Sequence, residues 1–180
     1  MKVITAAVIK GGAGKTTTCT ALAQAAAADG KRVLAIDLDP QGNFSFFIGA
    51  DQTAPGSAKR LQRALEPLKK KYDLVFIDTP PQMGELTFNA LQASTGLIIP
   101  LETDHGSLQG LFRIVDIAHQ MQRHNAGLTI YGVILTRYDN RPRLNRYLRD
   151  AIRDQGEDIG APLLMEIRAG IAVKEAQAMQ

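Results

Sequence analysis

The stretch that decides the fold is KGGAGKTT, Lys10 to Thr17. It lies between an apolar, β-branched run at 3–9 (VITAAVI) and an alanine-rich segment with helical character at 16–28. Three glycines without a Cβ let main-chain N–H groups turn inward around a phosphate, and the helix that follows adds the positive end of its dipole. A strand, a glycine-rich loop and a helix in this order predict a phosphate-binding loop, although Ile9 stands where the pattern GxxxxGK[ST] has its first glycine.

The polar residues of this loop have separate roles in the predicted site. Lys15 places a positive charge on the β- and γ-phosphates, and Thr16 offers its hydroxyl to Mg²⁺. A glycine-rich turn with an incidental lysine is the alternative, and the flanking strand and helix disfavour it. The pattern leaves Lys10, the first lysine of the loop, without a function. The residues expected to bind the nucleotide here are Gly11, Gly12, Ala13, Gly14, Lys15, Thr16 and Thr17.

The rest of the chain repeats the alternation of apolar runs and helical patterns. The runs are almost continuously hydrophobic, which is typical of strands buried on both faces of a parallel sheet; they lie at 33–37, 74–78, 96–101, 130–136 and 162–167. Helical patterns lie between them at 59–71, 107–123 and 142–156, and a loop is expected at 49–58. The order predicts an α/β fold, a doubly wound, mostly parallel sheet with helices on both faces. We expect residues 1–180 to form a single domain.

Composition narrows the classes of function. The 180 residues carry a formal net charge of +3, which by itself is weak evidence for a nucleic-acid partner. The single cysteine, Cys19, excludes a disulfide framework within the chain and a zinc cluster built on cysteines, and we expect it to be buried in a helix. The chain shows neither a secretory signal nor the roughly 18 consecutive apolar residues of a membrane span. A cytoplasmic location without a membrane partner is expected.

Carboxylates follow two of the predicted strands. In such folds ligands bind beyond the carboxyl ends of the strands, where Asp37, Asp39 and Asp78 lie. An apolar strand that ends in aspartate is typical of the carboxylate behind a Mg²⁺ ion, so Asp78 is the counterpart of the Walker B aspartate and a second-shell metal residue. The spacing of Asp37 and Asp39 points both side chains the same way, and one of them is suited to hold the attacking water. The alternative is that each aspartate caps a loop.

Six stretches together resemble motifs of the ParA/Soj-type partition ATPases, a deviant Walker A P-loop family related to MinD. The similarity extends over nearly the whole chain, through KGGAGKTT (10–17), VLAIDLDPQGN (33–43), YDLVFIDTPP with LTFNAL (72–81 and 86–91), GVILTRYDNR (132–141) and KEAQ (174–177). The resemblance implies a P-loop NTPase fold, ATP and Mg²⁺ as cofactors, and hydrolysis of ATP to ADP and phosphate.

The resemblance also implies a role for Lys10. In this family two subunits close face to face on ATP, and the signature lysine of each contacts the phosphates of the other. Lys10 is then catalytic in trans and Lys15 in cis, while Asp39 orients the hydrolytic water and Asp37 lies near the metal. Thr136 and Arg137 are implied as adenine contacts. A solvated surface lysine is the alternative for Lys10.

Partners follow from the same resemblance. It implies an ATP-dependent homodimer, non-specific binding of double-stranded DNA, association with the nucleoid, and a ParB-like partner or cargo adaptor in plasmid or chromosome partition. Family members carry a longer segment before the Walker B strand and continue beyond residue 180, so this chain is either a small variant or shortened at its C-terminus. A MinD-type ATPase at a membrane surface and a metabolic ATP-dependent ligase are the alternatives. The first needs a C-terminal amphipathic helix, for which IAVKEAQAMQ (171–180) is too short and not basic enough.

The segment 142–156 combines an apolar and a basic face. At 100° per residue, one arc holds Leu144, Tyr147, Leu148, Ala151 and Ile152. The opposite arc holds Arg143, Arg146, Arg149 and Arg153. The resemblance favours a surface that contacts the DNA backbone. The alternative is a solvated face with salt bridges from Asp150 and Asp154. An earlier basic stripe is also expected to be solvated; it consists of Lys59, Arg60, Arg63 and Lys69–Lys71.

Overall fold

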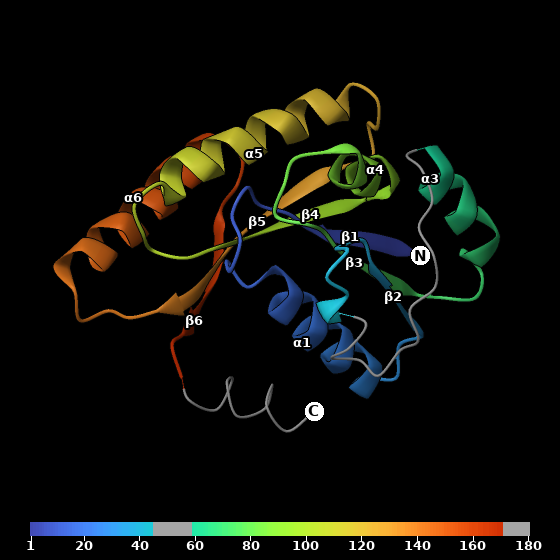
Figure 1. The fold of residues 1–180 in the computed structure, drawn as a ribbon, viewed down its shortest axis with the longest axis horizontal. Coiled ribbons are helices and arrows are strands. Elements are labelled where there is room, and N and C mark those ends of the chain that lie inside the picture. Colours follow the sequence, from blue (N-terminus) through green and yellow to red (C-terminus); the bar gives the residue numbers. More distant parts are fainter. Residues whose placement is uncertain (45–58, 171–180) are drawn as a thin grey trace.

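The computed structural model describes residues 1–44 and 59–170, which form a six-stranded sheet flanked by helices (Figure 1). Every pair of neighbouring strands is parallel, in the order β2-β3-β1-β4-β5-β6. The predicted α/β class with a parallel sheet is therefore confirmed. The strands are β1 (Lys2–Ala6), β2 (Val33–Asp37), β3 (Leu74–Asp78), β4 (Gly96–Leu101), β5 (Thr129–Tyr138) and β6 (Leu163–Arg168).

Helices cover both faces of the sheet. Figure 1 shows α1 on one side and α3, α4, α5 and α6 on the other. Cys19 and Ala23 of α1 pack on Ala6 and Phe76, which confirms that the cysteine is buried. The helices are α1 (Lys15–Ala28), α3 (Lys59–Leu65), α4 (Glu85–Ala93), α5 (Ser107–Gln122) and α6 (Arg143–Asp158), with a short 3₁₀ helix η1 (Glu66–Leu68).

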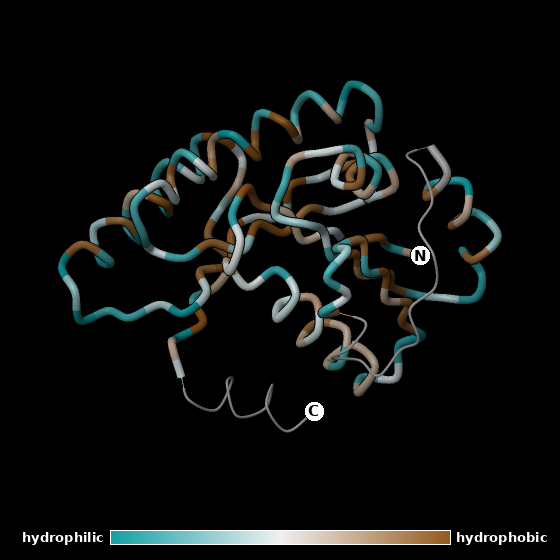
Figure 2. The backbone as a smooth tube through the Cα atoms, viewed as in Figure 1, coloured by the Kyte–Doolittle hydropathy of each residue, from teal (hydrophilic) through white to brown (hydrophobic). Residues whose placement is uncertain are grey.

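The core lies along the central strands, where Figure 2 shows the hydrophobic residues concentrated. All six residues of β4 are buried. Leu97 and Ile99 of β4 pack in one cluster with Leu111 and Val115 of α5. A strand with helices on both sides presents neither face to water, so its sequence is continuously apolar rather than alternating.

Several boundaries differ from the sequence prediction. The segment predicted as one helix at 59–71 is α3 followed by η1, with Pro67 inside the 3₁₀ turn. β1 ends at Ala6, three residues before the end of the apolar run at Ile9. Pro142 is the N-cap of α6 rather than its first residue. The loop expected at 49–58 lies outside the described residues.

The apolar face of α6 is only partly covered. Ile152 is fully buried, whereas Leu144 and Tyr147 are 56% and 68% exposed. The helical periodicity predicts that this whole arc faces the core, and that prediction is wrong for the first turns of the helix. The periodicity of a helix decides which side chains share a face, but only the neighbouring elements decide how far along that face is covered.

Replacing Gly132 with alanine is expected to destabilise the protein at the β5–β6 contact. Gly132 has a φ of 143°, and a Cβ there would lie 2.1 Å from the carbonyl oxygen of Pro162 and 2.9 Å from Cγ of Leu164. Because one of these atoms is backbone, the strands would have to separate. We expect the free energy of unfolding to fall by about 2–4 kcal/mol in urea denaturation.

The matched control is Gly110→Ala in α5. A Cβ at Gly110 meets no atom within 4 Å, so the better helix propensity of alanine should raise the free energy of unfolding by about 0.5–1 kcal/mol. Equal effects of the two substitutions would show that the close approach of β6 to Gly132 does not constrain the sheet.

Candidate nucleotide-binding site

The loop from residue 7 to residue 14 joins β1 to α1 and has the backbone of a phosphate cradle. Gly12 and Gly14 adopt left-handed φ angles of 78° and 82°, which side chains with a Cβ disfavour. Gly14 is the N-cap of α1, and no side chain caps this helix. Main-chain N–H groups at the start of a helix suit an anion. These features fit the phosphate-binding role predicted for the loop.

Lys15 folds back over this loop. Its side chain is buried, and Nζ donates a hydrogen bond to the carbonyl oxygen of Lys10 at 3.1 Å. Burial lowers the pKa of Lys15 below its ordinary value, and the negative charges of Asp78 and Asp39 partly oppose this shift. A phosphate beside the amine would favour its charged form further, so the electrostatics of the loop suit a polyphosphate.

Asp78 is fully buried at the end of β3. Its Oδ2 accepts a hydrogen bond from Thr16 Oγ1 at 2.5 Å, and its Oδ1 accepts one from the Thr79 N–H at 3.1 Å. Burial is the main cause that raises the pKa of Asp78 to about 6, and the Thr16 hydrogen bond opposes it. Asp37 pairs with Asp78 in the β2–β3 register, and its charge raises the pKa of Asp78 further.

These residues fit a Mg²⁺ ion. A hydroxyl and carboxylates are oxygen ligands of the kind that Mg²⁺ prefers, and a nearby cation would favour the ionised form of Asp78. Among the described residues, no three His, Cys, Asp or Glu side chains are grouped so as to hold a metal ion. Such a site suits an ion that takes its other ligands from phosphate and water. Thr16 would coordinate the Mg²⁺ ion, and Asp37 and Asp78 would lie in the second shell around it.

Asp39 lies in the turn after β2. Its main-chain N–H donates to Asp37 Oδ1 at 3.0 Å, and its own Oδ1 accepts from the Gln41 N–H at 3.0 Å. Both carboxylates therefore shape this turn, as the loop-capping alternative requires. The charge of Asp39 also acts on Lys15, so its side chain is electrostatically coupled to the phosphate loop. Its role toward the attacking water stays a prediction.

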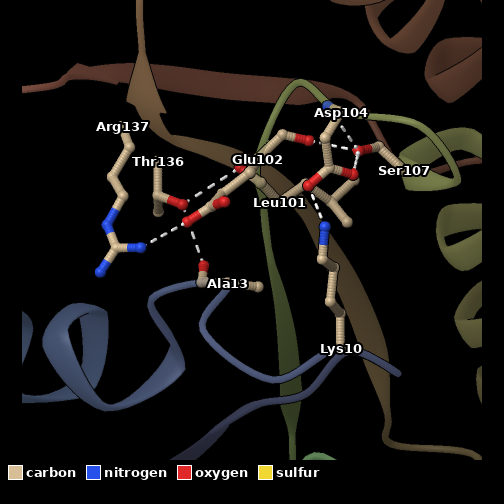
Figure 3. Close-up of polar contacts among 8 residues, drawn as sticks. All are labelled: Lys10, Ala13, Leu101, Glu102, Asp104, Ser107, Thr136 and Arg137. Atoms are coloured by element: carbon tan, nitrogen blue, oxygen red, sulfur yellow. Dashed lines mark hydrogen bonds and ion pairs between the residues drawn. The ribbon is translucent and has the colours of Figure 1, made fainter.

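The end of β4 adds residues that sequence reasoning missed. The Lys10 amine forms an ion pair with Asp104, in the loop between β4 and α5 (Figure 3). The same carboxylate accepts a hydrogen bond from Ser107 Oγ at 2.8 Å. Asp104 lies just beyond the carboxyl end of β4, and Asp37 and Asp78 are the last residues of β2 and β3, so the same strand-end argument would have found it.

Thr136 and Arg137, the two predicted adenine contacts at the end of β5, contact different loops of the site. The Thr136 hydroxyl lies 2.9 Å from the carbonyl oxygen of Ala13 and 3.2 Å from that of Leu101. Arg137 has a left-handed φ of 52°, and its guanidinium pairs with Glu102 at 2.9 Å on the exposed rim. The structure thus brings Thr136 against the phosphate loop and Arg137 against the β4–α5 loop. Contact of either residue with adenine stays a prediction.

The arginines of α6 differ in how far they are neutralised. Arg143 is exposed. Arg146 is exposed too, and its NH1 donates to the carbonyl oxygens of Asn140 and Arg141. The remaining two have acidic partners, Asp150 and Glu166 for Arg149 and Asp150 and Asp154 for Arg153. Arg149 and Arg153 thus form the salt bridges expected of a solvated helix face, which is the alternative to DNA binding.

The earlier basic stripe lies on a different segment. Arg63 and Lys69–Lys71 are exposed as expected, and the side chains of Lys59 and Arg60 lie outside the described part of the structure.

Asp78→Asn is expected to change how stability depends on pH. Without nucleotide and Mg²⁺, the folded protein holds the Asp78 proton up to its pKa of about 6, whereas the unfolded chain releases it near 3.8. The unfolded state thus binds fewer protons in this window, and the free energy of unfolding of the wild type falls as the pH rises through it. The variant should lack this decline, so its free energy of unfolding should rise relative to that of the wild type by about 2–3 kcal/mol between pH 4 and pH 7.

The measurement is urea denaturation of both proteins in EDTA between pH 4 and pH 8. Other titrating groups are common to both, so only the difference between the curves reports on Asp78. A difference that stays constant across this range would contradict the raised pKa.

Comparison with known proteins identifies the family. The model of the CobQ/CobB/MinD/ParA nucleotide binding domain matches residues 4–180. An uncharacterized Pseudomonas putida protein is 37% identical in an alignment that covers 80% of this chain and 73% of that protein. The sporulation initiation inhibitor protein Soj of Bacillus subtilis is 32% identical in an alignment that covers 79% of this chain and 78% of Soj.

A solved structure agrees with these relatives. The crystal structure of cobyrinic acid a,c-diamide synthase from Mycobacterium smegmatis, with bound ADP and magnesium, matches with a TM-score of 0.83 and 29% identity and covers 99% of this chain and 94% of that chain. Within the described ranges, no helix is both long and apolar enough to cross a membrane. The family expected from the motifs is confirmed: the chain belongs to the CobQ/CobB/MinD/ParA nucleotide-binding family.

Proposed function

We propose that this chain is a Mg²⁺-dependent ATPase of the partition type, in which bound ATP holds two copies face to face. The similarity to Soj and the family match support the class, and the bound ADP and magnesium of the Mycobacterium smegmatis structure support the cofactors. Hydrolysis removes the γ-phosphate between the copies and so ends their association. The dimer would bind DNA without sequence preference and respond to a ParB-like partner or cargo adaptor.

The observation that carries this proposal is the different placement of the two lysines. Lys15 is buried and crosses its own loop. The Lys10 amine leaves the loop for Asp104 on the rim, and its side chain is 42% exposed. A lysine that belonged to its own phosphate site would be expected to point into the loop, as Lys15 does. Lys10 is therefore available to a second copy that docks on this rim.

In the proposed reaction the protein supplies position and charge. Lys15 holds the β- and γ-phosphates, and Lys10 of the second copy approaches the same phosphates from across the interface. Asp39 orients the attacking water in line with the γ-phosphate. Mg²⁺, when bound beside Thr16, neutralises charge on the phosphate oxygens. Without the triphosphate, Lys10 stays paired with Asp104 of its own copy and no charge bridges the two faces, so nucleotide and association are coupled.

A second candidate is an ATP-dependent ligase. The match to a diamide synthase structure at 29% identity favours it, because that similarity extends over nearly the whole chain. Such an enzyme turns over ATP only with an acid to activate, whereas a partition ATPase hydrolyses ATP without an acceptor. ATP turnover in the absence of any small-molecule acid therefore separates the two candidates.

Lys10→Ala is expected to abolish ATP-dependent self-association. Because the amine serves the other copy, the affinity of one subunit for MgADP should change less than about threefold, while ATP turnover falls roughly 100-fold. Light scattering after size exclusion with MgATP and with MgADP measures association, and phosphate release measures turnover. Lys31→Ala, on an exposed lysine after α1, is the control and should behave as the wild type. Unchanged association and turnover in Lys10→Ala would refute the role in trans.

Asp104→Asn tests whether Lys10 must leave its own chain in order to serve the second copy. Its carboxylate holds Lys10 within the chain, so its removal should free the amine for the second copy. Both side chains are partly exposed, and such ion pairs contribute at most about 1 kcal/mol each. A symmetric dimer releases two of them, so the ATP-dependent dimer should tighten by no more than about 30-fold. Weaker association would show that Asp104 itself is needed at the interface.

DNA binding should depend on the first arginines of α6. Arg143 and Arg146 are exposed without an acidic partner among the ion pairs of this helix, whereas Arg149 and Arg153 are paired. We expect Arg143→Ala with Arg146→Ala to weaken retention on random duplex DNA in MgATP about tenfold and to lower its salt dependence. Arg149→Ala with Arg153→Ala should weaken it less. Equal retention of the wild type on DNA with ATP, with ADP and without nucleotide would contradict the proposal that ATP controls DNA binding.

A further inference from the structure

We propose that Thr136 is a positioning residue for the phosphate loop, and that it orients the peptide between Ala13 and Gly14 so that the Gly14 N–H faces the phosphate. This role concerns nucleotide binding by a single subunit. It therefore rests on the nucleotide binding of the proposed function but does not depend on the dimer.

Thr136 reaches the loop from a distant part of the chain. It lies on β5, 123 residues after Ala13, and only 7% of it is exposed. Its hydroxyl carries one proton, which is shared between the carbonyl oxygens of Ala13 at 2.9 Å and Leu101 at 3.2 Å (Figure 3). The hydroxyl thus ties the phosphate loop to the ends of β4 and β5 at once.

The geometry of the peptide bond explains how this contact orients an N–H group of the phosphate loop. In a planar trans peptide the C=O and the following N–H point in opposite directions. Thr136 holds the Ala13 carbonyl toward β5, so the Gly14 N–H points to the opposite side of the loop. A phosphate cradle requires its N–H groups on one side, and a single reversed peptide would present a carbonyl oxygen to the anion.

The rest of the side chain contacts the neighbouring glycine. A Cβ at Gly14 would lie 3.1 Å from Thr136 Cγ2 and 3.3 Å from Thr136 Cβ, and Gly14 has a left-handed φ as well. Thr136 therefore packs against the N-cap of α1, where a Cβ would be crowded as well as strained by the left-handed φ. Its hydroxyl and methyl contact two consecutive residues of the loop, which explains why a β-branched hydroxyl side chain suits this position.

The test compares Thr136→Val with Thr136→Ser. Valine keeps the shape but cannot donate to Ala13, whereas serine keeps the hydroxyl and loses the methyl. The dissociation constant for MgADP, measured by calorimetry on the folded proteins, is expected to rise about tenfold in the valine variant, which corresponds to about 1.4 kcal/mol. Serine should restore it to within about threefold of the wild type.

A second ligand separates the phosphate loop from the adenine base. Inorganic triphosphate has no base, so a role through the loop predicts the same loss of affinity for Mg-triphosphate as for MgADP in Thr136→Val. A loss confined to MgADP would mean that Thr136 contacts the base and would overturn the proposal.

Thr5→Val is the matched control for stability. Thr5 is fully buried, and its hydroxyl bonds to Ser94 Oγ rather than to the phosphate loop. It should lower the melting temperature while leaving the affinity for MgADP unchanged. Equal affinities for MgADP in wild type and Thr136→Val would refute the positioning role. Failure of the wild type to bind MgADP at all would instead refute the proposed function.

Discussion

The site depends on the orientation of a few peptide groups between β1 and α1. Main-chain N–H groups can surround a phosphate only if the loop takes left-handed turns, as Gly12 and Gly14 do. Glycine permits that conformation but does not select it, because it is equally free to adopt others. Selection comes from neighbours: Thr136 holds the carbonyl of Ala13, and Lys15 holds that of Lys10. The parallel sheet matters because it brings the ends of its strands to the same edge.

Charge is the second constraint on this edge. Burial lowers the pKa of Lys15 and raises that of Asp78, so burial disfavours the charged form of each group. A phosphate beside Lys15 and a cation beside Asp78 would each reverse the unfavourable effect of burial. Any ligand that binds only the folded state stabilises it by mass action. The nucleotide and its metal therefore complete a site whose charges are only partly compensated within one chain.

The basic residues show where this reasoning needs the tertiary structure. By spacing, the four arginines of α6 are equivalent, since all lie on one arc of the helix. In the fold, Glu166 on β6 reaches Arg149, which also lies over the ring of Tyr138. Arg143 and Arg146 lie nearer the start of the helix, where Leu144 and Tyr147 are exposed as well. The candidate DNA surface is thus smaller than the sequence pattern suggests.

The sequence by itself determined the fold class and the phosphate loop, because both rest on local rules. Continuous apolar runs separated by helical patterns admit few arrangements other than a parallel sheet, and the glycines and lysine of residues 11–15 act within one short segment. Only the tertiary structure decided the contacts of Lys10 with Asp104 and of Thr136 with Ala13. The residues of these pairs are 94 and 123 positions apart in the sequence. The periodicity of apolar residues does not specify such contacts, because the order of the strands in the sheet decides which residues become neighbours.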